Sequence, residues 1–308
     1  MLNTLVCGIM LATLANAQPA QDSPNLSFRK LDSASQVTPQ TSQEWSPPDY
    51  MENWKFGIDF GQTKIPFYFA DLIFPLLRPS TDTRILFVEP RVNHRSGETL
   101  LNNGIGYRQL VKDRSWMLGT NFFYDYDTHL SHYRVGTGLE AISVFSEFRA
   151  NGYFGLSPAR VAEPGGNTEV VEKAVNGFDV EVGAPVPYYS RLKVFGGYEW
   201  YDFGEFKDRN GWSFRAEFKP IPTIVWNILL SNNTKSTLAW GANVAFRIPF
   251  GNNTPEKWQS PFKLDKEMFP PSDVSNRLVT LVERHNEIVV KRYTRTAGQV
   301  NIEVRRGT

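Results

Sequence analysis

Two aspartates and two histidines lie close together near the middle of the chain, and side chains of these types can take part in catalysis or metal binding. They are Asp125, Asp127, His129 and His132. Carboxylates and imidazoles at this spacing could bind a metal ion or act as the general acid and base of a hydrolase. A hydrophilic loop tip would use the same residue types. Because the chain has no Gly-x-Ser-x-Gly, His-Glu-x-x-His or Cys-x-x-Cys pattern, we interpret the cluster as a loop and predict no catalytic residue, metal or cofactor.

The segment that leads into this loop, residues 115–127, alternates with a period of two and therefore predicts a β-strand. One face is apolar and the other is mixed. A soluble sandwich or lipocalin-like barrel would bury the apolar face, whereas a membrane barrel would turn it toward lipid. The apolar face consists of Trp116, Leu118, Thr120, Phe122, Tyr124 and Tyr126, and the mixed face of Met117, Gly119, Asn121, Phe123 and Asp125.

The N-terminus and the composition favour the membrane barrel. Residues 1–17 form an uncharged apolar run that ends in Ala-Asn-Ala, which predicts a signal peptide cleaved before Gln18. The single cysteine, Cys7, lies inside that run, so the exported chain would have no disulfide. With 33 basic and 32 acidic residues the charge is balanced, which gives no support for nucleic acid as a partner. No apolar run after the signal is long enough for a transmembrane helix.

The remaining pattern predicts an all-β fold, an antiparallel transmembrane β-barrel of twelve strands in the outer membrane. Residues 18–52 are Ser-, Gln- and Pro-rich and read as a flexible periplasmic lead-in, 53–250 as the barrel, and 251–276 as a linker. Connections alternate between short turns and longer loops, such as those expected at 93–102, 155–174 and 202–210. The predicted strands are 53–61, 64–77, 84–93, 102–111, 115–127, 131–140, 144–155, 174–184, 191–201, 211–219, 223–231 and 237–250.

Charged side chains fall on one face of these strands. We expect that face to line the lumen, because a basic residue facing lipid at mid-depth would cost about 2–4 kcal/mol. They could set the ion selectivity of a channel or form a satisfied lining for a segment inside the pore. The lumen-lining candidates are Asn121, Arg134, Glu147, Arg149, Asp179, Glu181, Lys193, Glu199, Arg215, Glu217, Asn243 and Arg247.

Two glycines and two further histidines have a structural interpretation. Gly104 and Gly106 in NNGIGY could suggest a nucleotide-binding loop, but no helix follows them. We expect them to relieve crowding between the barrel wall and the contents of the pore. His94 and His285 are isolated in sequence, and we interpret both as structural residues.

Several short motifs resemble the translocator domain of the intimin and invasin family, the inverse autotransporters. They are IPFY at 65–68, NGYF at 151–154, NGFD at 176–179, YEWY at 198–201, PIP at 220–222 and LVERHNEIV at 281–289. The resemblance implies that the C-terminal linker returns through the pore toward the cell surface, where such chains continue into a passenger.

Residues 277–308 would then be a pore-threading or plug segment, and with the chain ending at Thr308 we expect no passenger domain. An orphan porin-like channel is the alternative. Strand-like residues 288–293 and a possible short strand at 300–305 follow the motif. The pore-linker candidates are Leu281, Val282, Glu283, Arg284, Asn286, Ile288 and Val289.

The expected partners follow from this class of protein. The barrel would contact outer-membrane lipid in a Gram-negative bacterium. Its biogenesis would need periplasmic chaperones and the barrel-assembly machinery. A homodimer is possible, and no nucleic acid is expected.

Overall fold

A computed structural model describes residues 53–62, 64–77, 83–221, 223–247, 260, 262–269 and 273–296. The predicted signal peptide and lead-in, and the possible strand at 300–305, lie outside these residues. The wall strands are β1 (Lys55–Gly61), β2 (Lys64–Asp71), β3 (Phe74–Leu77), β4 (Arg84–Arg95), β5 (Glu98–Val111), β6 (Trp116–Asp127), β7 (Tyr133–Ser143), β8 (Glu147–Gly155), β11 (Gly177–Val186), β12 (Tyr189–Tyr201), β13 (Arg209–Ile221), β14 (Ile224–Asn233) and β15 (Ser236–Arg247).

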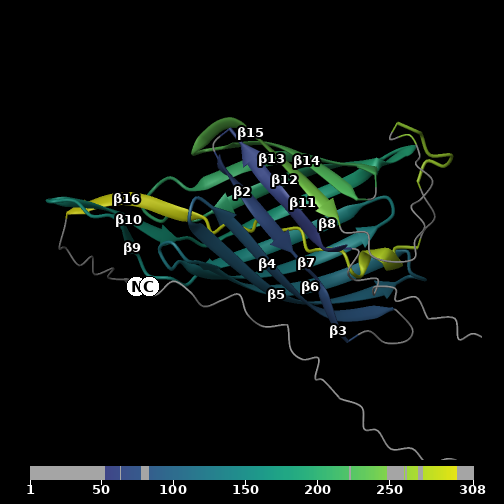
Figure 1. Ribbon diagram of the computed structural model, residues 1–308, viewed down its shortest axis with the longest axis horizontal. Coiled ribbons are helices and arrows are strands. Elements are labelled where there is room, and N and C mark those ends of the chain that lie inside the picture. Colours follow the sequence, from purple (N-terminus) through teal and green to yellow (C-terminus); the bar gives the residue numbers. More distant parts are fainter. Residues whose placement is uncertain are drawn as a thin grey trace, which may run out of the picture. The chain divides into compact units, whose positions relative to one another are not determined.

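These strands close into one antiparallel barrel (Figure 1). β1 pairs with both β15 and β2, and β4 pairs first with β3 and then with β2. β2 and β3 are therefore two parts of a single interrupted strand, which the sequence predicted as 64–77. Counted this way the wall has twelve strands, as predicted. Among the residues that the structure describes, no helix has the length and apolar character needed to cross a membrane.

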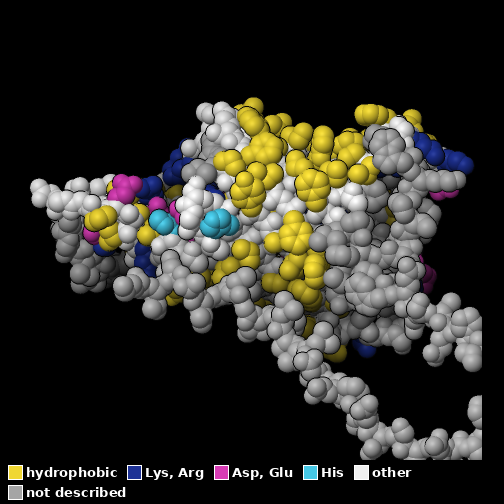
Figure 2. Space-filling model, in the orientation of Figure 1, with side chains coloured by type: hydrophobic (Ala, Val, Ile, Leu, Met, Phe, Trp, Pro, Cys, Tyr) yellow, Lys and Arg dark blue, Asp and Glu magenta, His cyan; other side chains and the backbone are white. Residues whose placement is uncertain are grey.

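The apolar faces of the strands point outward. On β6, Leu118, Phe122 and Tyr124 are each more than two-fifths exposed, whereas Met117 and Phe123 are buried inside the barrel. Figure 2 shows hydrophobic side chains gathered over the outer surface of the wall strands. A closed barrel pairs the backbone amides and carbonyls of its strands with one another, so such a surface can meet hydrocarbon.

The two ends of the barrel differ. At one end short connections join β5 to β6, β7 to β8, β11 to β12 and β13 to β14. At the other end lie the long connections from β8 to β11 and from β12 to β13, the latter at the predicted position. Outer-membrane barrels have short periplasmic turns and longer extracellular loops. We therefore call the first the periplasmic end and the second the extracellular end.

The prediction of a long loop at residues 93–102 is wrong. β4 continues to Arg95 and β5 begins at Glu98, so only Ser96 and Gly97 form the turn, with φ of 40° and 86°. This is the left-handed geometry of a two-residue hairpin turn. The polar residues that suggested a loop face the lumen, where the Asn93 Nδ2 donates to Asn102 Oδ1 at 2.9 Å.

A second antiparallel sheet has three strands and lies at the extracellular end. It contains β9 (Arg160–Glu163), β10 (Thr168–Ala174) and β16 (Val290–Thr296), in the order β16-β10-β9. β9 and β10 form a hairpin within the predicted 155–174 loop, which the sequence did not reveal. β16 contains the strand-like residues that follow the LVERHNEIV motif. The C-terminal segment thus pairs with an extracellular loop far away in sequence.

The outward and inward faces of β15 give a first prediction. Trp240 is about half exposed on the outer surface, whereas Asn243 lines the lumen cavity. Trp240→Arg should destabilise the barrel by about 2–4 kcal/mol if it lies near mid-depth, because the cation would face lipid. Asn243→Arg should cost less, because its side chain meets water. Urea unfolding of both variants in vesicles measures this, and equal losses would contradict the assignment of the faces.

Candidate functional site: the pore and the segment inside it

The segment 274–289 runs through the barrel interior from the periplasmic end to the extracellular end (Figure 1). At its start the Val274 amide donates to the Arg114 carbonyl, in the turn between β5 and β6, at 2.9 Å. A single turn of 3-10 helix, η2 (Ser275–Arg277), follows. At its end the Val289 carbonyl accepts a hydrogen bond from the Val175 amide at 3.1 Å, next to β10. The two ends of the segment therefore contact opposite ends of the barrel.

The first half of the segment is apolar and packs against an apolar part of the wall. Leu278, Val279, Leu281 and Val282 are all buried. Burying an aliphatic side chain of this size contributes about 1.5–3 kcal/mol, so this half holds the segment firmly. Its partners in one cluster include Ile85, Phe87, Leu110, Met117, Phe123 and Ile142.

The second half of the segment is held by a buried ionic centre at Asp125. Arg284 donates to both carboxylate oxygens of Asp125, at 2.8 and 2.7 Å. Arg134 on β7 donates to the same carboxylate at 2.7 Å, and Asn102 on β5 does so at 2.7 Å. The Asp125 side chain is completely buried. A charge at such a site requires these partners, because its desolvation is otherwise uncompensated.

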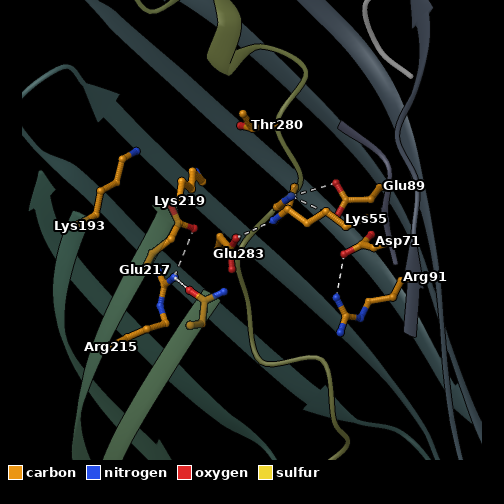
Figure 3. Close-up of polar contacts among 12 residues, drawn as sticks. Lys55, Asp71, Glu89, Arg91, Lys193, Arg215, Glu217, Lys219, Thr280 and Glu283 are labelled. Atoms are coloured by element: carbon orange, nitrogen blue, oxygen red, sulfur yellow. Dashed lines mark hydrogen bonds and ion pairs between the residues drawn. The ribbon is translucent and has the colours of Figure 1, made fainter. Parts of the chain in front are cut away.

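Wall side chains also bind the main chain of the segment. Arg108 donates to the carbonyls of Leu278, at 3.0 Å, and Thr280. The carboxylate of Glu89 accepts the Val282 amide at 3.1 and 3.0 Å (Figure 3). Further contacts join Asn102 to the carbonyl of Asn286, Arg134 to the carbonyl of His285, and the Tyr153 hydroxyl to the amide of His285. Segment residues 281–289 have no regular secondary structure, so the wall supplies partners that a helix or sheet would otherwise supply.

The lumen-lining candidates on the opposite side of the barrel form a second network. Glu147 binds Arg149 and, at 2.5 Å, Lys193, and it also contacts Arg277 of the segment at 2.8 Å. Glu181 binds Arg149 at 3.1 Å and Arg215 at 2.6 Å. Arg277 joins this network to the start of the segment.

Glu283 points toward that opposite side of the barrel. Its carboxylate is 3.4 Å from the Lys55 amine. Figure 3 shows it between Lys55 and the pair Arg215 and Glu217, which lie 4.0 Å from each other. Its neighbour Arg284 turns to Asp125 instead, so adjacent residues of the segment contact opposite parts of the wall.

The other candidates are more scattered. Arg247 is opposite Lys55 in the β1–β15 register at the periplasmic end, and Asn243 lines a cavity. Asn121 donates to Glu140, and Asp179 accepts from Tyr153. Among the segment candidates Ile288 lies near Asn93, and Val289 packs with Tyr153, Val175, Tyr201 and Phe203. Glu199 binds Arg209 at 2.8 Å near the extracellular end.

Sequence reasoning missed the side chains that bind the segment most directly. Asp125 was placed on the mixed face of strand 115–127 but also in a loop, and it was not among the lumen-lining candidates; it lies on β6 and faces the lumen. Arg108, Glu89 and Asn102 fall within or at the edge of the predicted strands and were not singled out. The period-two alternation could have identified these residues, because each of them is next to an outward-facing apolar residue on its own strand. Applied strictly, that pattern would have assigned them to the lumen.

The structure separates Asp125 from the other three residues of the suspected site, which stay together at the turn between β6 and β7. Asp125 binds arginines inside the barrel, while Asp127 accepts the His129 amide at 2.9 Å in the turn. His132 is buried 3.0 Å from the Ser157 hydroxyl, and burial lowers its pKa. Among the residues with described positions, no group of three or more His, Cys, Asp or Glu side chains could hold a metal ion.

Glycines shape the inner wall. A Cβ added to Gly104 would lie 2.3 Å from the Phe123 ring, and one added to Gly106 would lie 2.3 Å from the Phe87 ring. Each ring belongs to the residue directly opposite on the next strand. Arg284 stacks over Phe123 at 4.3 Å, and Arg108 over Phe87 at 4.7 Å. These glycines therefore relieve crowding, but against aromatic rings of the wall itself and not directly against the pore contents that the sequence suggested.

The same arrangement recurs around the barrel. Each set consists of a glycine, an inward aromatic ring on the next strand and an arginine over that ring. The flat ring leaves room for the guanidinium group. Stacking adds a cation–π attraction to the ion pairs of the lumen. The further sets are Gly57, Phe69 and Arg91; Gly136, Tyr153 and Arg134; Gly183, Phe195 and Arg215; and Gly177, Tyr201 and Arg209.

The segment does not fill the whole lumen. A cavity of about 380 Å³ remains between residues 281–287 and the inward faces of β1, β2 and β11–β15. Its lining is mixed, with polar residues such as Asp59, Asn227, Ser231 and Asn243 beside apolar ones such as Phe67, Val225 and Leu229. The segment thus follows the wall formed by β4–β8 and leaves a space of mixed lining on the other side.

Comparison with known proteins identifies the class of this barrel. The model of the inverse autotransporter β-domain family matches residues 12–286, so the chain belongs to that family. It is a translocator barrel of the Gram-negative outer membrane. The solved chain from "Unveiling the Mechanism Behind the in-meso Crystallization of Membrane Proteins" has the same fold, with a TM-score of 0.61 and 19% identity over 78% of this chain and 99% of that one.

Curated relatives are much longer than the part they share with this chain. The inverse autotransporter adhesin YeeJ of Escherichia coli K12 is 27% identical over 67% of this chain, which is 9% of its own length. Invasin of Yersinia enterocolitica is 29% identical over 43% of this chain and 16% of its own length. A putative attaching and effacing protein homolog of E. coli K12 is 27% identical over 49% of this chain and 53% of its own.

Proposed function

We propose that this barrel exports its own C-terminal segment and then retains it in the pore as a surface anchor. The observation that carries the proposal is the path of residues 274–296, which contact the periplasmic turn of β5 and β6 at one end and the extracellular hairpin β9–β10 at the other. A segment that merely closed the pore from the periplasm would not need to reach that hairpin.

Recognition of main-chain atoms supports the export of a polypeptide. Arg108, Glu89, Asn102 and Arg134 bind amides and carbonyls of the segment. Such groups are present at every residue, so similar contacts could form with other parts of the chain as they pass. Arg284 and the apolar residues around Leu281 add side-chain specificity at the final position. We infer a lining that tolerates passage and favours one resting register.

The exit would be secured by strand addition at the surface. β16 pairs with β10 along its whole length, from Val290 opposite Ala174 to Thr296 opposite Thr168. Arg295 binds Glu169 at 2.5 Å, and Arg292 binds Glu163. Extended peptides commonly bind exposed sheet edges in this way. The hairpin would capture the segment as it emerges and prevent its return.

A disulfide cross-link tests this arrangement in cells. Val171 lies directly opposite Tyr293, so Val171→Cys with Tyr293→Cys should form an intramolecular disulfide. Val171→Cys with Arg295→Cys is the control, because those positions are two residues out of register. The measurement is the mobility of the oxidised chain on a non-reducing gel. Equal cross-linking of both pairs, or of neither, would contradict the proposed exit.

A porin-like channel is the second candidate function, and the cavity of about 380 Å³ beside the segment favours it. In that case the segment would be a constriction that sets conductance, as charged linings do in pores. We propose no enzymatic activity, since Asp125 is held by arginines inside the barrel, and the other three candidates contact backbone, serine or glutamate groups at the turn. The conductance of the barrel with and without the segment separates the two functions.

The proposed partners follow from the class of protein. Assembly would need periplasmic chaperones and the barrel-assembly machinery, and the outer surface would contact lipid; a homodimer is also possible, while nucleic acid has no proposed role. Two of the relatives are named an adhesin and an invasin. We therefore propose that whatever this barrel displays beyond Thr296 acts in contact between the bacterium and another surface.

A further inference from the structure

A short segment that follows the last wall strand is fixed to the periplasmic rim of the barrel. The Asp265 amide donates to the Tyr188 carbonyl at 2.8 Å, and the Tyr188 amide donates to the Met268 carbonyl at 3.0 Å. The Asp265 carboxylate accepts the Ser190 amide at 2.7 Å. These three hydrogen bonds join residues 262–268 to the turn between β11 and β12. These hydrogen bonds therefore fix residues 262–268 at the level of the periplasmic rim.

The fixed segment exposes an unusual amount of apolar surface. Phe262, Leu264 and Met268 are 78%, 66% and 49% exposed, and Tyr188 in the adjoining turn is 49% exposed. Together they form the rim patch. Large apolar side chains clustered outside the strands imply a partner, because isolated exposed residues of this kind are common but adjacent ones are not.

The rim patch continues the lipid-facing surface of the barrel. Tyr189 directly follows Tyr188, and its ring centre lies 6.2 Å from that of Phe218. The Phe218 ring centre is in turn 6.3 Å from that of Trp226, which is exposed on the outer surface. A row of aromatic side chains at the end of a barrel marks the membrane–water interface. The patch therefore lies beside the level at which the periplasmic leaflet ends.

We propose that residues 262–268 form an interfacial anchor that inserts Phe262, Leu264 and Met268 into the periplasmic phospholipid leaflet. Lys263 and Lys266 are exposed beside these apolar residues, and Asp265 and Glu267 balance their charge; the flexible lysine stems would carry the amines to lipid phosphates. Interfacial segments combine apolar insertion with basic flanks in this way. A protein partner would not require the patch to adjoin the aromatic row, so lipid is the occupant that the geometry favours.

The anchor would hold the start of the pore segment in place. Only a few residues separate Met268 from Val274, which binds the periplasmic turn between β5 and β6. Holding residues 262–268 at the membrane would keep the start of the pore segment at the rim of the barrel. Force applied to the displayed part of the chain would then be borne partly by lipid. This proposal does not depend on the direction of export.

Site-directed spin labelling of the full chain tests the anchor. In a Cys7→Ser background, nitroxide labels would be placed at Phe262→Cys and Leu264→Cys in vesicles of phosphatidylethanolamine and phosphatidylglycerol. Glu267→Cys, exposed on the same segment, is the aqueous control, and Ile228→Cys, exposed on the outer wall, is the lipid reference. The readout is the ratio of collision rates with oxygen and with a water-soluble nickel complex.

We expect the ratio at positions 262 and 264 to be several-fold higher than at 267 and to approach that at 228. A ratio equal to that at 267 would place the patch in water and overturn the proposal. Low collision rates with both reagents would also overturn it, because they would show that protein covers the patch, either a second copy or another chain. Heat-modified migration on gels, compared with the unlabelled chain, verifies that each variant has folded.

Discussion

Asp125→Ala is expected to destabilise the protein by about 3–5 kcal/mol, because it leaves the buried guanidinium groups of Arg134 and Arg284 without their shared carboxylate. The loss has two consequences, since Arg134 belongs to the wall and Arg284 to the pore segment. The barrel should unfold at lower urea concentration, and the segment should become sensitive to added protease. Unfolding in vesicles followed by tryptophan fluorescence measures the first effect, and limited proteolysis measures the second.

Glu205→Ala is the matched control for this prediction. Glu205 is an exposed carboxylate in the loop between β12 and β13, and a substitution there should change stability by no more than about 0.5 kcal/mol. Arg284→Ala should also be destabilising, and the double variant with Asp125→Ala should lose less than the sum of the two single losses. If Asp125→Ala behaved like Glu205→Ala, the ionic centre would not hold the segment.

Removal of residues 273–308 is expected to open the barrel. The segment occupies the side of the lumen next to β4–β8, and its removal would join that space to the cavity of about 380 Å³ on the other side. Single-channel conductance in planar bilayers should then rise severalfold above that of the full chain. A chain ending at Thr296 is the control, because it keeps the whole pore segment and should remain at low conductance.

This experiment also separates the two proposed functions. Equal conductance of the full and the shortened chains would mean that the segment does not obstruct the pore, which would favour a stand-alone channel. The variant must first be shown to form a barrel, by heat-modified migration on gels. Otherwise the inward apolar residues that the deletion uncovers, such as Phe87 and Met117, could have collapsed together.

The wall of the barrel could be predicted from the sequence because the strands obey one simple rule. Lipid outside and water inside impose a period of two, and residues such as Leu118 and Trp240 mark the outer face. The alternation indicates which face of a strand a residue lies on, but it does not indicate where the strand ends. For this reason Asn93 and Asn102 were assigned to a loop. Their polarity belongs to the lumen, where they bind each other.

The pairings inside the lumen could not be predicted in the same way. Which inward residues meet depends on the stagger of the strands and on the position of the segment between them. Arg284 and Asp125 are far apart in sequence, and the sequence around either residue does not indicate that the other is its partner. The strands β9 and β10 were missed for a related reason, since they are stabilised by pairing with each other and with β16, which is far away in sequence.

The proposed export function requires that the C-terminal segment enter the pore at the periplasmic end and leave it at the cell surface. Labelling of single cysteines on intact cells with a membrane-impermeant maleimide tests this most directly, in the Cys7→Ser background. Lys235→Cys in the turn between β14 and β15 marks the extracellular end, and Asp113→Cys in the turn between β5 and β6 marks the periplasmic end. Thr296→Cys, at the end of β16, is the position to be decided.

We expect Thr296→Cys to be labelled on intact cells as readily as Lys235→Cys, while Asp113→Cys is labelled only after the outer membrane has been permeabilised. If Thr296→Cys instead behaved like Asp113→Cys while Lys235→Cys was labelled on intact cells, the segment would end in the periplasm. That result would contradict both the threaded path and the export function that we infer from it.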